Sequence, residues 1–350
     1  LHSFPTRRSS DLADEAWSGV LRNLKARDEP RARALLGRAR ARSKLQRMYD
    51  ALADLDNAIA IATEIGDVAL EVEALLLKGT VLDHCDDFER STEVSLHAKQ
   101  RLEGHELADL AVDVRLAEIR AIFREGRFED AAPMLRELME AAHVHGRAEA
   151  ETIAALLLGC ALSDLHQVDE AERVFARMID QCLERGDRFH LAAAYGNRAW
   201  LWTARGEVEK TADDLRLVIQ IAREEGQAQL ERAATHNLGE YRLWEGKLDE
   251  ALQLARRGFA LQSRAGEGST RLDRFLLARV FAARGDRTEL AELLATFEGE
   301  SGLSDADQAL LELLHAVLGE LDDWGAALDK LDALYVGMRL EIAHLACVRG

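Results

Sequence analysis

The stretch GRFEDA at residues 126–131 decides the fold, because variants of it return at multiples of forty residues. They read GEVEKT at residues 206–211 and GKLDEA at residues 246–251. Two sets of positions around them, called columns below, recur every forty residues. One column is always apolar, and the other, three residues later, is always small. These columns are Met48, Phe88, Phe128, Val168, Val208 and Leu248, and then Ala51, Ser91, Ala131, Ala171, Thr211 and Ala251. Such a fixed period predicts a stacked repeat protein.

Residues 148–187 show how one repeat is built. A second helix is expected to follow the first after a short polar turn and to end at Gly186, since glycine takes the left-handed conformation without strain. The small column allows the two antiparallel helices to approach closely, and a leucine there would cost about 1–3 kcal/mol. The first helix carries apolar residues at helical spacing, namely Ile153, Leu156, Leu157 and Cys160.

The composition favours helices throughout the chain. Alanine, leucine, glutamate and arginine dominate, and only three of the 350 residues are proline. No run of alternating β-branched residues is long enough for a strand, and no apolar stretch is long enough to cross a bilayer. We therefore expect an all-α fold, a right-handed α-solenoid of stacked antiparallel helical hairpins.

The turn motif Gly-x-apolar-acidic-x-small resembles that of the tetratricopeptide repeat. The first-helix pattern of that family is matched by Asn237-Leu238-Gly239-x-Tyr241. The usual unit of the family is shorter, and the forty-residue version is similar to arrays in large bacterial signalling proteins. HEAT-type repeats share the period but lack this turn motif, so we favour the tetratricopeptide-like interpretation.

The resemblance covers about residues 28–335. Residues 13–27 are expected to form a linker or an N-terminal helix, and Trp324-Gly325-Ala326-Ala327 suggests an eighth unit. The expected units are 28–67, 68–107, 108–147, 148–187, 188–227, 228–267, 268–300 and 303–336, followed by a capping helix at 337–350.

The first twelve residues, LHSFPTRRSSDL, have no part in the repeat. They resemble a translated sequencing-adapter remnant, and a disordered tail is the alternative. We exclude residues 1–12 from the fold, and we expect the natural protein to be a longer one.

The net charge of −18 is unevenly spread along the chain. Between Arg22 and Arg47, ten lysines and arginines face only Asp28 and Glu29, so the rest of the chain is strongly acidic. An acidic body argues against a nucleic-acid surface there. The basic stretch fits a solvated helix face better than a phosphate-binding one.

No arrangement of residues predicts catalysis. Neither a phosphate-binding glycine loop, nor H-E-x-x-H, nor G-x-S-x-G is present, and His84-Cys85-Asp86-Asp87 falls in a repeat turn. The four cysteines lack metal spacing and predict free buried thiols in a reducing, cytoplasmic compartment. We therefore expect no enzyme activity, no cofactor, no metal and no membrane association.

Aromatic residues concentrate between Phe189 and Trp244, where six of the nineteen fall. Asn197 and Asn237 share one repeat column, and asparagine can both donate to and accept from a peptide backbone. In the family, first helices line the concave face. The resemblance therefore implies a partner-binding concave face at Asn197, Arg198, Trp200, His236, Asn237, Glu240 and Trp244. The alternative is that the aromatics are structural, and the columns of Trp202 and Tyr241 indicate core positions.

The leading hypothesis is a noncatalytic protein- or peptide-binding scaffold or sensor module from a larger bacterial signalling protein. The alternative is a small-molecule sensor, for a sugar or metabolite, in a transcription regulator. Self-assembly through the ends of the array is a third possibility, so the oligomeric state stays open.

Overall fold

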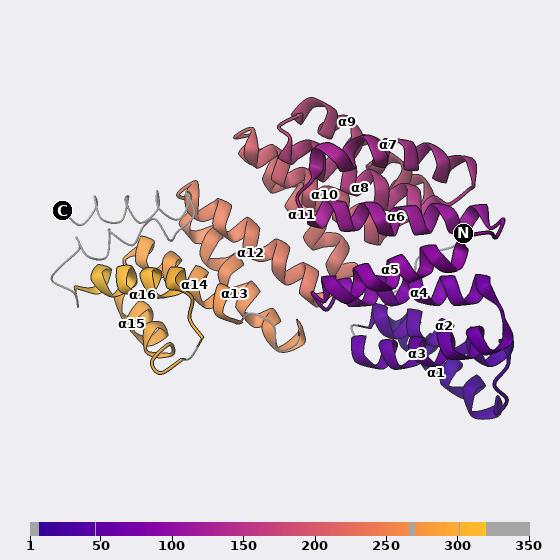
Figure 1. Ribbon diagram of the computed structural model, residues 1–350. Coiled ribbons are helices and arrows are strands. Elements are labelled where there is room, and N and C mark those ends of the chain that lie inside the picture. The colour runs from indigo at the N-terminus through magenta and orange to yellow at the C-terminus, as the bar shows by residue number, and fades with distance from the viewer. Residues whose placement is uncertain (1–6, 46, 266–269, 301, 320–350) are drawn as a thin grey trace. The chain divides into compact units, whose positions relative to one another are not determined.

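The computed structural model describes residues 7–45, 47–265, 270–300 and 302–319. Within these ranges the chain forms sixteen helices and no strand (Figure 1). The all-α prediction is therefore confirmed. The chain divides into two compact units, Leu1–Arg205 and Gly206–Gly350, and each is described by itself. The suggested turn at residues 324–327, the capping helix at 337–350 and Cys347 lie outside the described residues.

The described part of the first unit contains ten helices. They are α1 (Arg7–Asn23), α2 (Glu29–Lys44), α3 (Met48–Ile65), α4 (Val68–Asp83), α5 (Phe88–Leu102), α6 (Ala108–Arg124), α7 (Phe128–Val144), α8 (Ala148–Asp164), α9 (Val168–Arg185) and α10 (Arg188–Ala204). The helix α1 begins at Arg7, so the boundary expected after residue 12 falls inside a helix.

Six helices are described in the second unit. They are α11 (Val208–Glu224), α12 (Ala228–Trp244), α13 (Leu248–Ala265), α14 (Thr270–Arg284), α15 (Arg287–Ala295) and α16 (Asp305–Leu318). The helix α12 packs on α11 and α13, and α14 packs on α12, α13, α15 and α16. Phe275, Leu276 and Phe281 of α14 lie in the buried apolar cluster of this unit.

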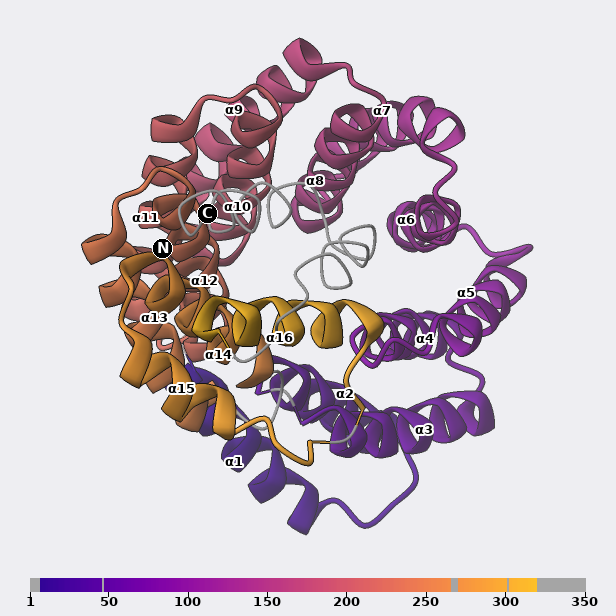
Figure 2. The ribbon, with the colours of Figure 1, turned by 90° about the vertical axis from the view of Figure 1, so that its left-hand side faces the viewer.

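The helices of the first unit form two layers (Figure 2). The inner layer contains α2, α4, α6, α8 and α10, and the outer layer contains α3, α5, α7 and α9. Each helix packs on the next one in the chain, and α4, α6, α8 and α10 also contact the neighbouring inner helix. This is the stack of hairpins that the forty-residue period predicts.

The small column forms the seam inside each hairpin. Ala131, Ala171 and Ala251 are fully buried, and Ser91 donates from Oγ to the Gly79 carbonyl at 3.1 Å. At Gly159 on α8, a Cβ would lie only 2.6 Å from the ring of Phe175 on α9. The second helix approaches here because the first has no side chain.

A left-handed residue closes the turn between the two helices of a hairpin. Gly126 and Gly246 both have φ of 73°, which glycine adopts freely. Asp86 and His166 stand at the matching positions with φ of 58°. A residue with a Cβ is strained in this conformation by roughly 1–2 kcal/mol. Within residues 84–87, Asp87 also caps α5 by accepting a hydrogen bond from the Arg90 N–H, so this turn is structural.

The basic stretch runs from the end of α1 through α2, and the arginines of α2 form ion pairs within the unit. Arg38 and Arg42 are mostly buried and both bind the Asp54 carboxylate, at 2.6 and 2.8 Å. Arg33 and Arg40 are about half exposed and pair with acidic residues as well. The predicted solvated helix face is therefore found only at Arg33 and Arg40. Arg38 and Arg42 are bound by a carboxylate of the protein itself.

Candidate functional site

An apolar stripe along one side of α8 is only partly buried against the core of the unit. Ile153, Leu156, Leu157 and Cys160 are half-buried, whereas Leu158 and Leu162 are buried in the hairpin core. The open positions recur at the spacing of one helix face. Sequence reasoning identified these residues as part of the helix but not as a site. The available signal was that α8 is apolar on more than one face.

The helix α10 extends this surface. The Cys160 thiol lies 3.2 Å from the Asn197 Oδ1 and donates to it, which joins the open sides of α8 and α10. Phe189 and Trp200 are 54% and 66% exposed and lie about three helical turns apart. Together these side chains form an apolar surface, called below the α8–α10 face and defined by Ile153, Leu156, Leu157, Cys160, Phe189 and Trp200.

Asn197 is half-buried and already makes two hydrogen bonds. Its Nδ2 donates to the Ala193 carbonyl at 2.9 Å, and its Oδ1 accepts from the Cys160 thiol. A primary amide has two donor hydrogens and two acceptor lone pairs. Within the described residues one donor and one acceptor position of this amide are therefore left over, and the two bonds fix the orientation of the side chain.

Arg198 stacks against aromatic rings of its own helix. Its guanidinium lies 5.3 Å from the centre of the Tyr195 ring and 5.7 Å from that of Trp202. Trp202 is buried, as its repeat column predicts, whereas Trp200 is open to solvent. Of the expected site residues in the first unit, Trp200 is therefore the most accessible.

The inner helices nearer the N-terminus carry matched charges instead. Arg40 of α2 reaches Glu73 of α4 at 3.1 Å. Arg120 of α6 donates to the Thr80 hydroxyl of α4 at 3.1 Å and also binds Asp83. The polar groups named here satisfy one another, whereas α10 carries the exposed Phe189 and Trp200.

Two of the expected site residues on α12, His236 and Glu240, belong to a largely buried ionic cluster with α14. The Asp273 carboxylate accepts from Arg232 at 2.7 Å and lies 3.1 Å from the His236 Nδ1. The Glu240 carboxylate binds Arg279 and lies 3.9 Å from the His236 Nε2. Burial raises the pKa of Asp273, but hydrogen bonds from His236 and Arg232 outweigh it and hold that pKa below its ordinary value. His236 and Glu240 thus link α12 to α14.

Asn237 and Trp244 are the more accessible of the expected site residues on α12. Asn237 is exposed, and Trp244 is 38% exposed. The Trp244 ring packs edge-on against Tyr241, with the ring centres 5.3 Å apart, and Tyr241 is half-buried. These side chains are accessible on α12, but the neighbouring His236 and Glu240 are engaged.

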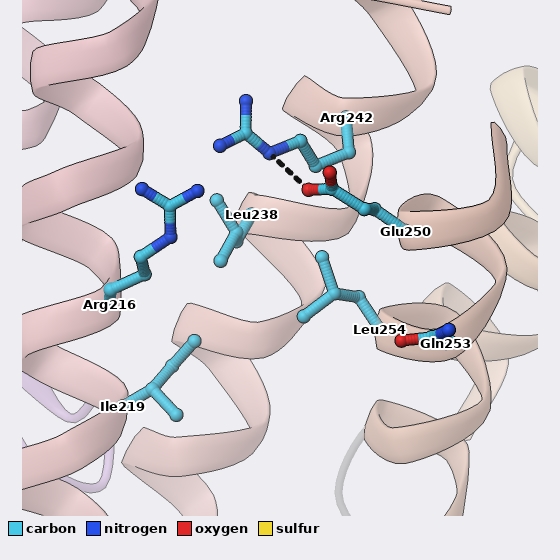
Figure 3. A pocket seen from close by; sticks show the side chains of 7 residues that line it. All are labelled: Arg216, Ile219, Leu238, Arg242, Glu250, Gln253 and Leu254. Atoms are coloured by element: carbon cyan, nitrogen blue, oxygen red, sulfur yellow. Dashed lines mark ion pairs between the residues drawn. The ribbon is translucent and has the colours of Figure 1, made fainter. Parts of the chain in front are cut away.

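A shallow cavity of about 320 Å³ lies among α11, α12 and α13 (Figure 3). Leu238 and Leu254 form its apolar floor, and the guanidinium groups of Arg216 and Arg242 approach it from one side. Arg242 is buried, and its Nε lies 3.1 Å from the Glu250 carboxylate. Two further carboxylates, of Glu209 and Glu245, also pair with Arg242. The acidic surroundings cancel the positive charge, so the cavity has little to attract an anion.

The Cys160 and Cys182 thiols are poor nucleophiles. Burial, with a contribution from the Asp164 charge, raises the pKa of Cys160 to about 12, and burial raises that of Cys182 to about 11. Thiols with such values are protonated near neutral pH. Cys182 is buried as expected, whereas Cys85 and Cys160 are only half-buried. The described residues contain no group of three or more His, Cys, Asp or Glu that could hold a metal ion.

None of the helices in the described part of the chain is long and apolar enough to span a membrane.

Comparison with known proteins identifies the fold. No family model and no curated protein matches the chain. Among solved structures, a Rap protein complexed with Competence and Sporulation Factor is similar with a TM-score of 0.59 at 14% identity, covering 97% of this chain and 96% of that one. The tetratricopeptide repeat sensor protein PH0952 from Pyrococcus horikoshii, a signal transduction ATPase with numerous domains, gives 0.56 at 14% identity, covering 90% and 48%. BtubC from P. vanneervenii gives 0.51 at 16% identity, covering 63% and 93%.

The chain therefore has the fold of a tetratricopeptide-repeat array, as the turn motif predicts. At these identities the likeness concerns the fold, so the function must be argued from the residues of this chain.

Proposed function

We propose that the chain is a noncatalytic protein- or peptide-binding scaffold whose binding surface includes the α8–α10 face. The observation that carries the proposal is the exposure of Phe189 and Trp200 beside the half-buried stripe on α8. Contiguous exposed apolar surface typically marks an interaction site. Large aromatic side chains supply most of the binding energy at such sites.

The fold neighbours support a role in signalling. The Rap structure is a complex with Competence and Sporulation Factor, so a protein of this fold can bind a partner. PH0952 carries its repeats as a sensor, and the likeness covers 48% of that chain. We therefore propose that this array is the sensor or scaffold part of a larger bacterial, cytoplasmic signalling protein. Micromolar binding, about −8 kcal/mol, suits such a role.

The second unit contributes accessible side chains of its own. Asn237 and Trp244 are accessible on α12, so we propose that they form a separate contact surface of this unit. His236 and Glu240 hold α12 against α14 and support these two residues from behind.

A selection from a random peptide library tests the proposal. Peptides of about twelve residues, displayed on phage, are selected on the full chain, and enriched peptides are measured by fluorescence anisotropy. Trp200→Ala and Leu157→Asn remove apolar contacts from the α8–α10 face, and we expect each to weaken binding more than about tenfold. Leu183→Ala is the control, because Leu183 is 56% exposed on the outer helix α9. It should change binding less than about twofold.

Thermal melting of each variant, followed by circular dichroism, separates lost binding from lost folding. Trp200 is 66% exposed, so Trp200→Ala should melt within a few degrees of the parent protein, about what a surface substitution changes. Peptides that bind Trp200→Ala and the parent protein equally would contradict the proposal. Sequencing the intact gene tests the signalling context, for which we expect a further signalling or DNA-binding domain in the same reading frame.

A further inference from the structure

We propose that the segment bound at the α8–α10 face is basic, with positively charged residues on either side of its apolar anchors. The inference rests on the proposed function and specifies the chemistry of the partner. It follows from the two carboxylates that end the apolar stripe of α8.

Glu149 and Asp164 lie at the two ends of this stripe. They continue the spacing of Ile153 and Cys160 along the same side of α8, one near each end of the helix. Both are exposed. The rise of an α-helix places them roughly 22 Å apart, the length of about seven extended residues. One short segment can therefore reach both carboxylates while its apolar side chains contact the stripe between them.

These two carboxylates differ from others on the inner layer. Glu73, Asp83 and Asp113 each bind an arginine of the first unit. Within the described part of the chain, neither Glu149 nor Asp164 is paired with a cation. Their negative charge is therefore available to a ligand.

The electrostatics of neighbouring groups agree with this placement. Burial raises the pKa of Asp113, and the Glu149 charge adds to that rise, although Arg147 opposes it. At the other end, burial and then the Asp164 charge raise the pKa of Cys160. The negative charges of Glu149 and Asp164 thus act on groups at the two ends of α8, although Arg147 opposes the Glu149 charge, and such charges favour a cationic partner.

Helix stability accounts for only one of these residues. A carboxylate in the first turn of a helix is favoured by the helix dipole, so Glu149 has a structural role as well. Asp164 is the last residue of α8, where the dipole is negative and a carboxylate is disfavoured. Its position is therefore explained better by an external cation than by the helix that carries it.

The test uses the peptides selected on the full chain whose binding is lost in Trp200→Ala. We expect these peptides to combine Leu, Phe or Trp with lysine or arginine and to carry a net positive charge. The double variant Glu149→Gln with Asp164→Asn should weaken their binding by about three- to tenfold and reduce its dependence on salt. The control Glu137→Gln with Asp180→Asn removes the same charges from exposed positions of the outer helices α7 and α9. It should change binding less than about twofold.

The outcomes separate the two proposals. Peptides that depend on Trp200 but are neutral or acidic would overturn the basic partner and leave the scaffold function standing. Equal effects of the two double variants would also overturn it, because overall charge and not these two residues would then matter. If no selected peptide depends on Trp200, the binding face itself is wrong.

Discussion

The first helices α10 and α12 use the same repeat columns for opposite chemistry. Asn197 and Asn237 share one column, and Trp200 and Glu240 share another. On α10 this produces an exposed tryptophan beside an internally bonded asparagine. On α12 it produces an exposed asparagine beside a glutamate that binds Arg279. The period thus fixes where a side chain lies on the hairpin, and the neighbouring helix decides whether it is free for a partner.

The largest expected effect comes from removing a carboxylate from the ionic cluster that links α12 to α14. Asp273→Asn removes a buried carboxylate that binds both Arg232 and His236, so we expect the free energy of unfolding to fall by about 3 kcal/mol. Urea denaturation of the full chain, with hydrogen exchange to locate the loss in α12 and α14, measures it. The control Asp249→Asn breaks an exposed pair with Arg284 and should cost less than about 1 kcal/mol. Equal losses would mean that the cluster does not stabilise this unit.

The difference in free energy of unfolding between the parent protein and Asp273→Asn, called the gap below, should depend on pH. The pKa of Asp273 is held below its ordinary value, so its stabilisation is present above the unfolded value of about 3.9 and is lost as the pH falls through the lower folded value. Denaturation of both proteins at neutral pH and at about pH 3 should show the gap closing under acid. A gap that is constant or grows in acid would contradict this interpretation.

A smaller effect tests the close packing of α8 on α9 beneath the α8–α10 face. Gly159→Ala places a Cβ 2.6 Å from the Phe175 ring beneath the α8–α10 face and should cost about 1–3 kcal/mol. Gly19→Ala in α1 is the matched control, because its Cβ would meet its nearest neighbour at 3.5 Å. That change should stabilise the helix by about 0.5–1 kcal/mol. Thermal denaturation compares the two, and the same sign for both would contradict the close packing.

The smallest effect concerns the turn between α8 and α9. His166 has a left-handed backbone, so His166→Gly should raise the free energy of unfolding by about 0.5–1 kcal/mol. His145→Gly is the control, since His145 has φ of −88° and glycine there only adds freedom to the unfolded chain. We expect that control to lose stability by a similar amount. A loss at His166 as well would show that its side chain matters more than its backbone.

The architecture of the hairpins could be predicted from the sequence because it depends on local, repeated requirements. Ala131 and Ala171 recur since two helices must approach at each seam, and Gly126 recurs since each turn needs a left-handed residue. His166 occupies a glycine position without being glycine, and the turn still forms because the flanking helices fix it.

The candidate site was predicted only in part. The columns placed Trp200 and Asn237 on accessible positions, but they could not show that Cys160 binds Asn197. Asp273 was missed, because it lies about forty residues from Arg232 in a repeat with an irregular period. Leu157 was identified as an apolar residue of the helix but not as part of a site, since a partly exposed apolar stripe and a buried one have the same spacing.

The most direct measurement is amide hydrogen exchange of the full chain with and without a selected peptide. If the peptide binds at the α8–α10 face, it should slow amide exchange in α8 and α10 and leave exchange in the outer helices α7 and α9 unchanged. Protection confined to the outer helices, or to α2 and α4, would contradict it.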